Sequence, residues 1–184
     1  MEPSRDSPDT TLNHRSRDNV AVQPQRRLAF TGFDNDDGSA DPALAGALQQ
    51  GDQGAILAAL TKARLLVPVV AILGEVAYDE QGLAHDKTSD MAVALLQGQD
   101  GRKALLAFTG TDSLARWNPE ARPMPAETRR VATAAIQEGA AAIVLDVAGP
   151  TPAVLETDDV RRLAAGLQVV RLEDGGYAWM ATGG

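Results

Sequence analysis

Four polar residues at positions 87–90, KTSD, stand directly before an apolar segment, where neighbouring hydroxyl and charged groups could react with or bind a ligand. Two readings are open. In one, the run is a structural turn, in which a hydroxyl satisfies backbone donors and Asp90 pairs with Lys87 or Arg102. In the other, it is a recognition edge joined by Arg116 and Trp117, whose types are enriched at interface hot spots. The residues that we expect to bind a partner or ligand are Lys87, Ser89, Asp90, Thr109, Arg116 and Trp117.

No residue is assigned a catalytic role. His85 and Asp86 could form a relay, but adjacent side chains usually point apart, and a general base needs groups that orient it. Ser89 and Ser113 are possible nucleophiles, yet neither lies in a GxSxG motif, and no SxxK motif occurs. The sequence has no cysteine, which excludes thiol catalysis and thiolate metal sites. We therefore expect that the protein is not an enzyme.

Neither a cofactor nor a metal ion is expected. No GxGxxG follows a predicted strand and no GxxxxGK[ST] occurs, so dinucleotide and P-loop phosphate sites lack their signal. The acidic run at residues 34–37 before Gly38 invites comparison with a calcium loop, but Phe33 and Leu44 would occupy its first and twelfth positions. We expect this segment to be a solvated linker, with Asp41 capping the next helix ahead of Pro42.

The charge balance favours a protein partner over a nucleic acid or a membrane. The 184 residues include 17 Lys and Arg against 25 Asp and Glu, a formal net charge of -8. Nucleic acids and anionic membranes are bound largely through cationic side chains, so both are disfavoured as partners. The longest apolar stretch, LLVPVVAILGEVA, contains Pro68 and Glu75 and is shorter than the ~20 residues that span a bilayer. The N-terminus lacks the apolar core of a signal peptide, so we expect a cytoplasmic location.

One domain behind a flexible tail is the predicted organisation. Residues 1–27 are polar and carry both signs of charge, so they cannot offset the entropy of ordering and should be disordered. Residues 28–184 should form the domain, with its core at about residues 38–172. An alternative is that residues 28–33 form an edge strand or dock onto the domain.

The first half of the domain is predicted to contain two helices and then strands. ALAGALQQ and QGAILAALTKA are separated by Gly51 and Asp52, which favours two short helices. The apolar run RLLVPVVAIL suits a strand buried on both faces, in which Pro68 indicates an edge or a bulge. Residues 91–97 and 104–108 have a β-like composition around the turn GQDG, which predicts a β-hairpin.

The second half is predicted to alternate helices and strands. A helix capped by Thr111 or Asp112 should follow the hairpin and end at the Asn-Pro of residues 118–119. PAETRRVATAAIQEG is the clearest helix, opening on Pro125 with Glu127 in its first turn. AAIVLDVAG behind it is a short buried strand, and a helix followed by a strand indicates an αβ unit on a central sheet.

PAVLE is a further possible strand, and a helix capped by Thr157 should then end at Gly166. The remainder holds a possible last strand, and its Tyr177 and Trp179 could dock on the domain or stay free for a partner. Trp117 could equally be a binding anchor or fill a core. Together these elements predict an α/β (α+β) fold, a single domain with a mixed β-sheet flanked by helices.

The segments HDKTSDMAVALLQGQDGRKALLAFTGTDSLARWNPEARPMP and AAIVLDVAGP resemble the SseB family, specifically the N-terminal domain of the enhanced-serine-sensitivity protein in its actinobacterial form. In that family a Lys-Ser-Ser-Asp-Met strand start, a hairpin turn and a Phe-Thr-Ser segment leading to a tryptophan recur in this order. Here they correspond to residues 87–91, 98–101, 108–110 and Trp117. The resemblance runs from about Gly38 to Gly166, and it departs where Gly110 replaces the usual serine, which weakens any role for a hydroxyl there.

The resemblance implies a compact α/β domain with no established enzymatic mechanism, and a name taken from a serine-sensitivity phenotype. We therefore expect a non-enzymatic protein-interaction or regulatory module. The alternative is a small-molecule sensing domain, for an amino acid, that uses the hairpin edge with Thr109, Thr111 and Asp112. A hydrolase is a third and weaker possibility.

Overall fold

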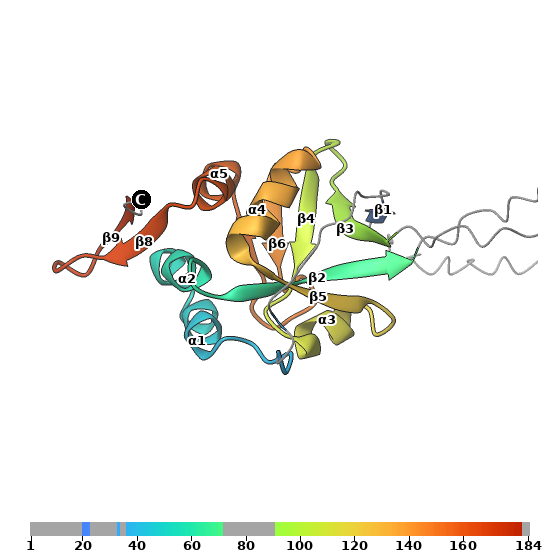
Figure 1. The fold of residues 1–184 in the computed structure, drawn as a ribbon, viewed down its shortest axis with the longest axis horizontal. Coiled ribbons are helices and arrows are strands. Elements are labelled where there is room, and N and C mark those ends of the chain that lie inside the picture. Colours follow the sequence, from blue (N-terminus) through green and yellow to red (C-terminus); the bar gives the residue numbers. More distant parts are fainter. Residues whose placement is uncertain (1–19, 23–32, 34–35, 72–90, 182–184) are drawn as a thin grey trace, which may run out of the picture.

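The computed structural model describes residues 20–22, 33, 36–71 and 91–181 (Figure 1). Among them, six strands form a mixed sheet in the order β5-β2-β3-β4-β6-β7, β1 pairs with β3 off this path, and β8 and β9 form a separate two-stranded sheet. The β4–β6 pair is parallel and the other pairs are antiparallel. The strands are β1 (Val20–Val22), β2 (Arg64–Ala71), β3 (Met91–Gln97), β4 (Lys103–Ala107), β5 (Arg122–Glu127), β6 (Ala142–Leu145), β7 (Ala153–Leu155), β8 (Gln168–Arg171) and β9 (Tyr177–Met180). The helices are α1 (Pro42–Gln50), α2 (Gln53–Leu60), α3 (Thr111–Trp117), α4 (Thr128–Gln137) and α5 (Thr157–Ala164).

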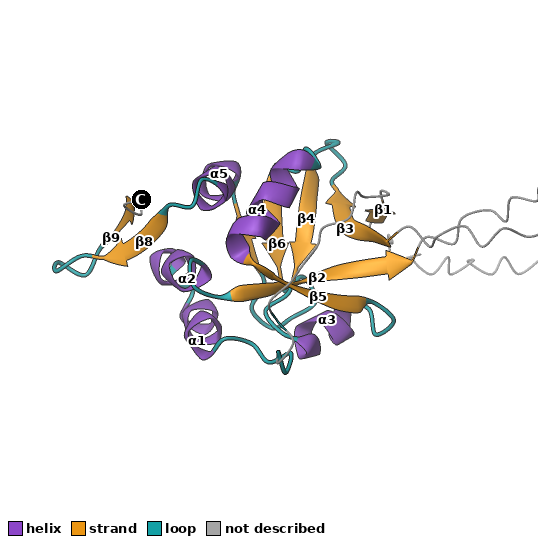
Figure 2. Cartoon of the chain, viewed as in Figure 1, coloured by secondary structure: helices purple, strands orange, loops and turns teal. Residues whose placement is uncertain are grey.

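Helices cover both faces of the sheet, which confirms the predicted single domain of α+β class (Figure 2). On one face α1, α2, α4 and α5 pack on the larger core, to which β2 contributes Leu65 and Val67. On the other face α3 packs on a smaller core around Phe108, to which β2 contributes Leu66. Neighbouring residues of β2 are thus buried on opposite faces, as its near-continuous apolar sequence predicts. The predicted hairpin is also confirmed, because β3 and β4 pair around the turn at residues 98–101.

Pro68 lies where β2 parts from β3. Residues 69–71 pair with β3, but residues 94–96 of β3 pair with β1 instead. Two residues before the proline, Leu66 exchanges backbone hydrogen bonds of 2.7 and 2.8 Å with Phe108. Backbone groups alternate in direction along a strand, so Pro68 faces the same side as Leu66 and has no N–H to donate there. β2 lies inside the sheet, so the prediction that Pro68 marks an edge strand is wrong. The proline instead lies where the pairing of β2 with β3 ends.

The sequence did not predict strand β5. Because β5 occupies residues 122–127, helix α4 begins three residues later than the predicted helix start at Pro125. Pro125 and Glu127 were expected to open that helix, yet both lie in β5, and α4 begins at Thr128 with Glu127 as its N-cap. The left-handed Gly139, with φ of 68°, follows the end of α4 as expected.

The prolines of β5 explain why it escapes prediction. Pro123 and Pro125 stand opposite Pro68 and Leu66 of β2. Because Leu66 directs its backbone groups toward Phe108, the backbone groups of Pro125 point away from β2. The missing N–H therefore costs no ladder hydrogen bond, and a sequence that reads as a helix start is stable as an edge strand.

The helix caps are partly as predicted. Asp41 caps α1, since its carboxylate accepts hydrogen bonds of 2.9 and 3.0 Å from the N–H groups of Ala43 and Leu44. The caps predicted for α3 and α5 are wrong: Gly110 and Glu156 precede these helices as N-caps without a side-chain bond, and Thr111 and Thr157 are first helical residues. Each of these two hydroxyls bonds a carbonyl outside its own helix, Thr111 that of Gly38 at 3.3 Å and Thr157 that of Ala141 at 2.5 Å.

The last segment forms two strands rather than one, and its aromatic residues dock on the domain. The β8–β9 hairpin stands beside α2 at one end of the molecule (Figure 1). Tyr177 packs on Gly54 of α2, where an added Cβ would lie 2.1 Å from its ring. Trp179 packs on the larger core, with the Arg162 guanidinium 5.7 Å from its ring centre.

β1 lies inside the range for which the sequence predicts a disordered tail, and it pairs with β3. Among the described helices none is long and apolar enough to cross a bilayer.

Candidate functional site

The candidate site lies at the carboxyl ends of the parallel strands β4 and β6. Thr109 and Gly110 follow β4, and Asp146 follows β6. The carboxyl ends of parallel strands are where open α/β sheets bind ligands. A pocket of ≈ 440 Å³ opens there between the strand ends, α1 and α3. Its lining includes Asp37, Ala45, Leu48, Thr109, Asp112, Arg116, Asp146 and Pro150.

Thr109 and Asp146 form the buried floor of this pocket, and each is only 5% exposed. The Thr109 backbone N–H donates to Oδ1 of Asp146 at 2.9 Å, and the Thr109 hydroxyl donates to Oδ2 at 2.7 Å. Asp146 itself has φ of 48°, in the left-handed region that aspartate tolerates better than most residues. The bonds join residues 37 positions apart and fix the ends of β4 and β6 relative to each other.

Arg64 holds the backbone of the pocket floor and the Asp36 side chain through its guanidinium group. Its Nη1 donates to the Thr109 carbonyl at 2.5 Å, and its Nη2 donates to the Ser39 carbonyl at 2.6 Å. Its guanidinium also holds Asp36 through Nε at 2.5 Å and Nη2 at 2.9 Å. These bonds, more than the Gly38 N–H, hold the pKa of Asp36 below its ordinary value, against the opposing effect of burial. The expectation of a solvated linker is therefore wrong at Asp36, because the Asp36 and Arg64 side chains are only 14% and 13% exposed, whereas Asp37 is exposed as expected.

The loop at residues 38–40 closes tightly over the strand end. Gly110 lies so near this loop that an added Cβ would sit 2.9 Å from the Ala40 nitrogen and 3.1 Å from the Gly38 oxygen. Glycine at position 110 thus permits a close backbone approach. The Ser113 hydroxyl donates to the Gly110 carbonyl at 2.9 Å, which ties the first turn of α3 to the same place.

The structure brings some of the predicted site residues together. Thr109 and Arg116 line the pocket, as do Thr111 and Asp112 of the small-molecule alternative. Trp117 lies outside the lining: it is half-buried against the smaller core, and its ring centre is 5.5 Å from that of Phe108. Lys87, Ser89 and Asp90 lie outside the described residues, as do His14 and His85.

Sequence reasoning missed Asp146 and Arg64, the two charged residues that organise the floor. Asp146 carried a usable signal, because it is a carboxylate placed directly after a short buried strand. Arg64 carried none, because its partners lie 25 to 45 positions away and only the fold reveals them.

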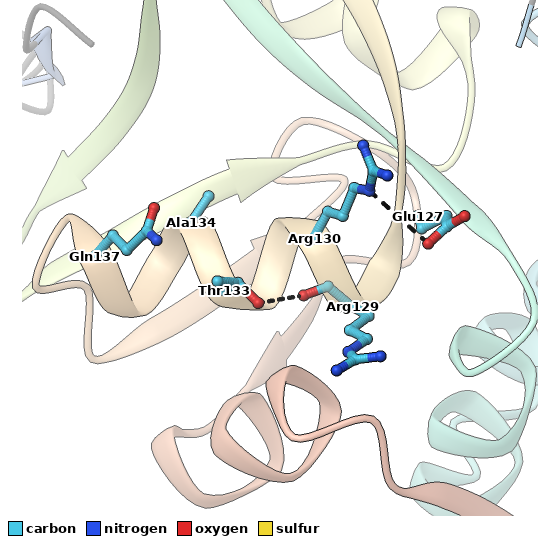
Figure 3. A pocket seen from close by; sticks show the side chains of 6 residues that line it. All are labelled: Glu127, Arg129, Arg130, Thr133, Ala134 and Gln137. Atoms are coloured by element: carbon cyan, nitrogen blue, oxygen red, sulfur yellow. Dashed lines mark hydrogen bonds and ion pairs between the residues drawn. The ribbon is translucent and has the colours of Figure 1, made fainter. Parts of the chain in front are cut away.

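A second pocket, of ≈ 320 Å³, lies over α4 (Figure 3). The Thr133 hydroxyl donates to the Arg129 carbonyl at 2.9 Å, and Arg130 lies 4.0 Å from Glu127. Arg129 and Arg130 point to different sides of the helix (Figure 3). Arg129 Nε donates to the Ala164 carbonyl at 3.4 Å. These side chains engage the protein itself, so this pocket is a weaker candidate.

The chemistry available in the candidate site is hydrogen bonding and charge. Among the described residues, no three histidine or carboxylate side chains are close enough to hold a metal ion. The site offers buried hydroxyl and carboxylate groups on its floor, an apolar wall from α1, and the exposed Arg116 at its rim. Such a mixture of apolar walls and a few convergent polar groups is typical of binding sites.

Comparison with known proteins identifies the family. The family model described as SseB protein N-terminal domain matches residues 41–162, from the start of α1 into α5. The match includes the main strands β2 to β7, Thr109, Asp146 and α3, and it ends before the β8–β9 hairpin. No curated protein and no solved structure matches the chain. The family match covers well over half of the sequence, and the chain therefore belongs to the SseB family, of which it contains the N-terminal domain.

Proposed function

We propose that this SseB-family chain is a non-enzymatic protein-interaction or regulatory module of the cytoplasm. The observation that carries the proposal is the position of α3, which places the exposed Arg116 on the rim of the strand-end pocket. The next residue, Trp117, is half-buried and its ring packs at a tilt of 34° against that of Phe108, which restricts the ring before any partner arrives. Tryptophan and arginine are enriched among residues that dominate binding energy, and a preordered side chain lowers the entropy cost of binding.

A non-catalytic role is supported by the hydrogen bonds of the pocket hydroxyls. Ser113 donates to the Gly110 carbonyl, and Thr109 donates to Asp146. The same Asp146 carboxylate also accepts the Thr109 backbone N–H, so it serves as a fixed clamp on the strand end. A nucleophile needs a base that can take its proton, and the Ser113 hydroxyl instead donates to a backbone carbonyl.

Affinity capture from native lysate tests the interaction. Specific partners of the wild type should be lost with the double variant Arg116→Ala, Trp117→Ala, and with Arg116→Glu, which leaves the Trp117 packing intact. Arg161→Ala is the matched control, since Arg161 is exposed on α5 and pairs with Asp158 of its own helix at 3.6 Å. If folded variants of α3 retain every specific partner, the proposed surface is wrong.

A small-molecule sensing domain is the second candidate, because Thr109, Thr111 and Asp112 line one pocket. Ligand binding raises apparent stability by mass action, so serine and related amino acids should raise the melting temperature at saturating concentrations. The absence of any shift would count heavily against this candidate. On the sequence motifs we also propose that the chain is of the actinobacterial type and shares the serine-sensitivity phenotype, which growth of a deletion strain on serine would test.

A further inference from the structure

Asp146 is a buried carboxylate that forms no ion pair with a cationic side chain in the part of the chain that the structure describes. It is 5% exposed and lines the strand-end pocket. Among the described residues, its carboxylate accepts hydrogen bonds from the N–H and the hydroxyl of Thr109, and no ion pair of those residues includes it. The nearby Arg64 gives its guanidinium to Asp36 and to backbone carbonyls. Buried carboxylates are usually paired with a cation, so this site lacks one part of a common arrangement.

The rest of the pocket has the charge to attract that cation. Asp37 and Asp112 lie on its lining with Asp146, against a single cationic side chain, that of Arg116. These carboxylates do not form a group that could hold a metal ion. An opposite charge is favoured in such a pocket at contact distance, and more strongly at its buried floor than at its exposed rim.

The pocket also has an apolar wall. Ala45 and Leu48 of α1 and Pro150 line it beside the polar floor. Lysine and arginine side chains carry a cationic head on an aliphatic stem, and they bury the stem along apolar surface. A volume of ≈ 440 Å³ exceeds what a single such side chain requires.

We propose that the strand-end pocket binds an organic cation, the ammonium or guanidinium head of a lysine or arginine side chain on the protein partner. The head lies at Asp146, and the stem lies along Leu48 and Pro150. This inference rests on the proposed interaction function and names the chemistry of the partner that this site accepts. A free amine has the same chemistry, so the test separates the two sources.

The test is an NMR titration of the full chain with matched probes. A capped Gly-Lys-Gly peptide should shift the amide signals of Thr109, Gly110 and Asp146 saturably. The same peptide with norleucine in place of lysine should bind at least tenfold more weakly, because it keeps the stem and lacks the charge. Equal binding of the two peptides, or shifts confined to other surfaces, would overturn the proposal.

Carboxylate-to-amide variants test which acidic side chains attract the lysine head. Asp146→Asn should weaken the lysine peptide at least tenfold, while Asp158→Asn, on the exposed face of α5, should leave binding unchanged. If Asp146→Asn does not fold, the double variant Asp37→Asn, Asp112→Asn changes only exposed rim residues and should weaken binding several-fold. Unchanged binding in that double variant together with equal binding of the norleucine peptide would remove the electrostatic basis of the proposal.

Butylammonium is the probe for a free amine. If the peptide binds at least as tightly as butylammonium, the partner side chain is supported; if butylammonium binds more tightly than the peptide, that assignment is wrong. The affinity-capture experiment and the peptide titration can fail separately, so they test the interaction function and the cation pocket independently. A peptide that binds in the absence of any captured partner would overturn the interaction function and leave the cation pocket standing, whereas full partner capture by folded Asp146→Asn would overturn the role of the pocket.

Discussion

Thr109 donates both its backbone N–H and its hydroxyl to the carboxylate of Asp146, over distances of 2.9 and 2.7 Å. Thr109 follows β4 and Asp146 follows β6, so the bonds fasten the two parallel strands just beyond the end of their ladder. Only Asp146 among the described non-glycine residues has a positive φ, which shows that the backbone turns sharply to present this carboxylate. The clamp is therefore a structural element as well as the floor of the pocket.

Removal of the clamp should destabilise the fold. Asp146→Ala leaves two buried donors of Thr109 without an acceptor and puts alanine in a left-handed conformation, which together should cost about 2 to 4 kcal/mol of unfolding free energy. Urea denaturation measures this difference. Asp146→Asn retains an acceptor and the tolerance for positive φ, so it should lose clearly less than Asp146→Ala, and equal losses would contradict the clamp.

Gly110→Ser should destabilise the protein, although the resemblance to the family implies a serine at this position. The new Cβ would lie 2.9 Å from the Ala40 nitrogen, a backbone atom that can move only with its loop. Overpacking of this kind costs about 1 to 3 kcal/mol. Gly46→Ala is the matched control, because its Cβ meets nothing within 4 Å inside α1, and it should stabilise the protein by about 1 kcal/mol. Thermal or urea unfolding of both variants gives the comparison, and a Gly110→Ser protein as stable as wild type would show that the loop gives way.

The Arg64–Asp36 pair should give stability a defined pH dependence. Because the pKa of Asp36 is lowered in the folded protein, its contribution is complete above its unfolded value of about 4 and is lost as pH falls through the folded value. The stability difference between wild type and Asp36→Asn should therefore be large at neutral pH and shrink toward about pH 2. Denaturation midpoints across this range test it, and a difference independent of pH would contradict the ion pair.

Gly54→Val should loosen the C-terminal hairpin without unfolding the sheet. An added Cβ lies 2.1 to 2.7 Å from the Tyr177 ring, so the ring must leave α2. Amide hydrogen exchange should speed up in β8 and β9 and stay slow in β4 and β6, because the hairpin opens as a local unit. Uniform acceleration would instead indicate that the hairpin and the sheet unfold together.

The sequence predicts those elements whose signals are local. Alternating and continuous apolar runs predict β2, β3, β4 and β6, and the cap of α1 follows from Asp41 and Pro42. Two of the binding residues expected from the sequence, Thr109 and Arg116, line one pocket.

What the sequence does not predict depends on contacts between distant residues. Pro125 reads as a helix start because its tolerance in a strand depends on which way the backbone of β2 faces at Leu66. Thr157 reads as a cap, but the nearest acceptor for its hydroxyl is the Ala141 carbonyl, 16 positions earlier. The floor of the pocket likewise joins Thr109 to Asp146 across 37 positions, so no local pattern reveals it.

The two prolines of β5 have a consequence for the behaviour of the protein in concentrated solution. Pro123 and Pro125 turn their backbone toward the open margin of the sheet and offer no N–H groups there. At these positions a strand from a second molecule could donate hydrogen bonds to the proline carbonyls, but its own carbonyls would receive none, because proline has no backbone N–H. At the opposite margin β7 is only 3 residues long, so it too is a poor template. The two ends of the six-strand order, β5 and β7, are therefore poor templates for pairing with a strand of a second molecule.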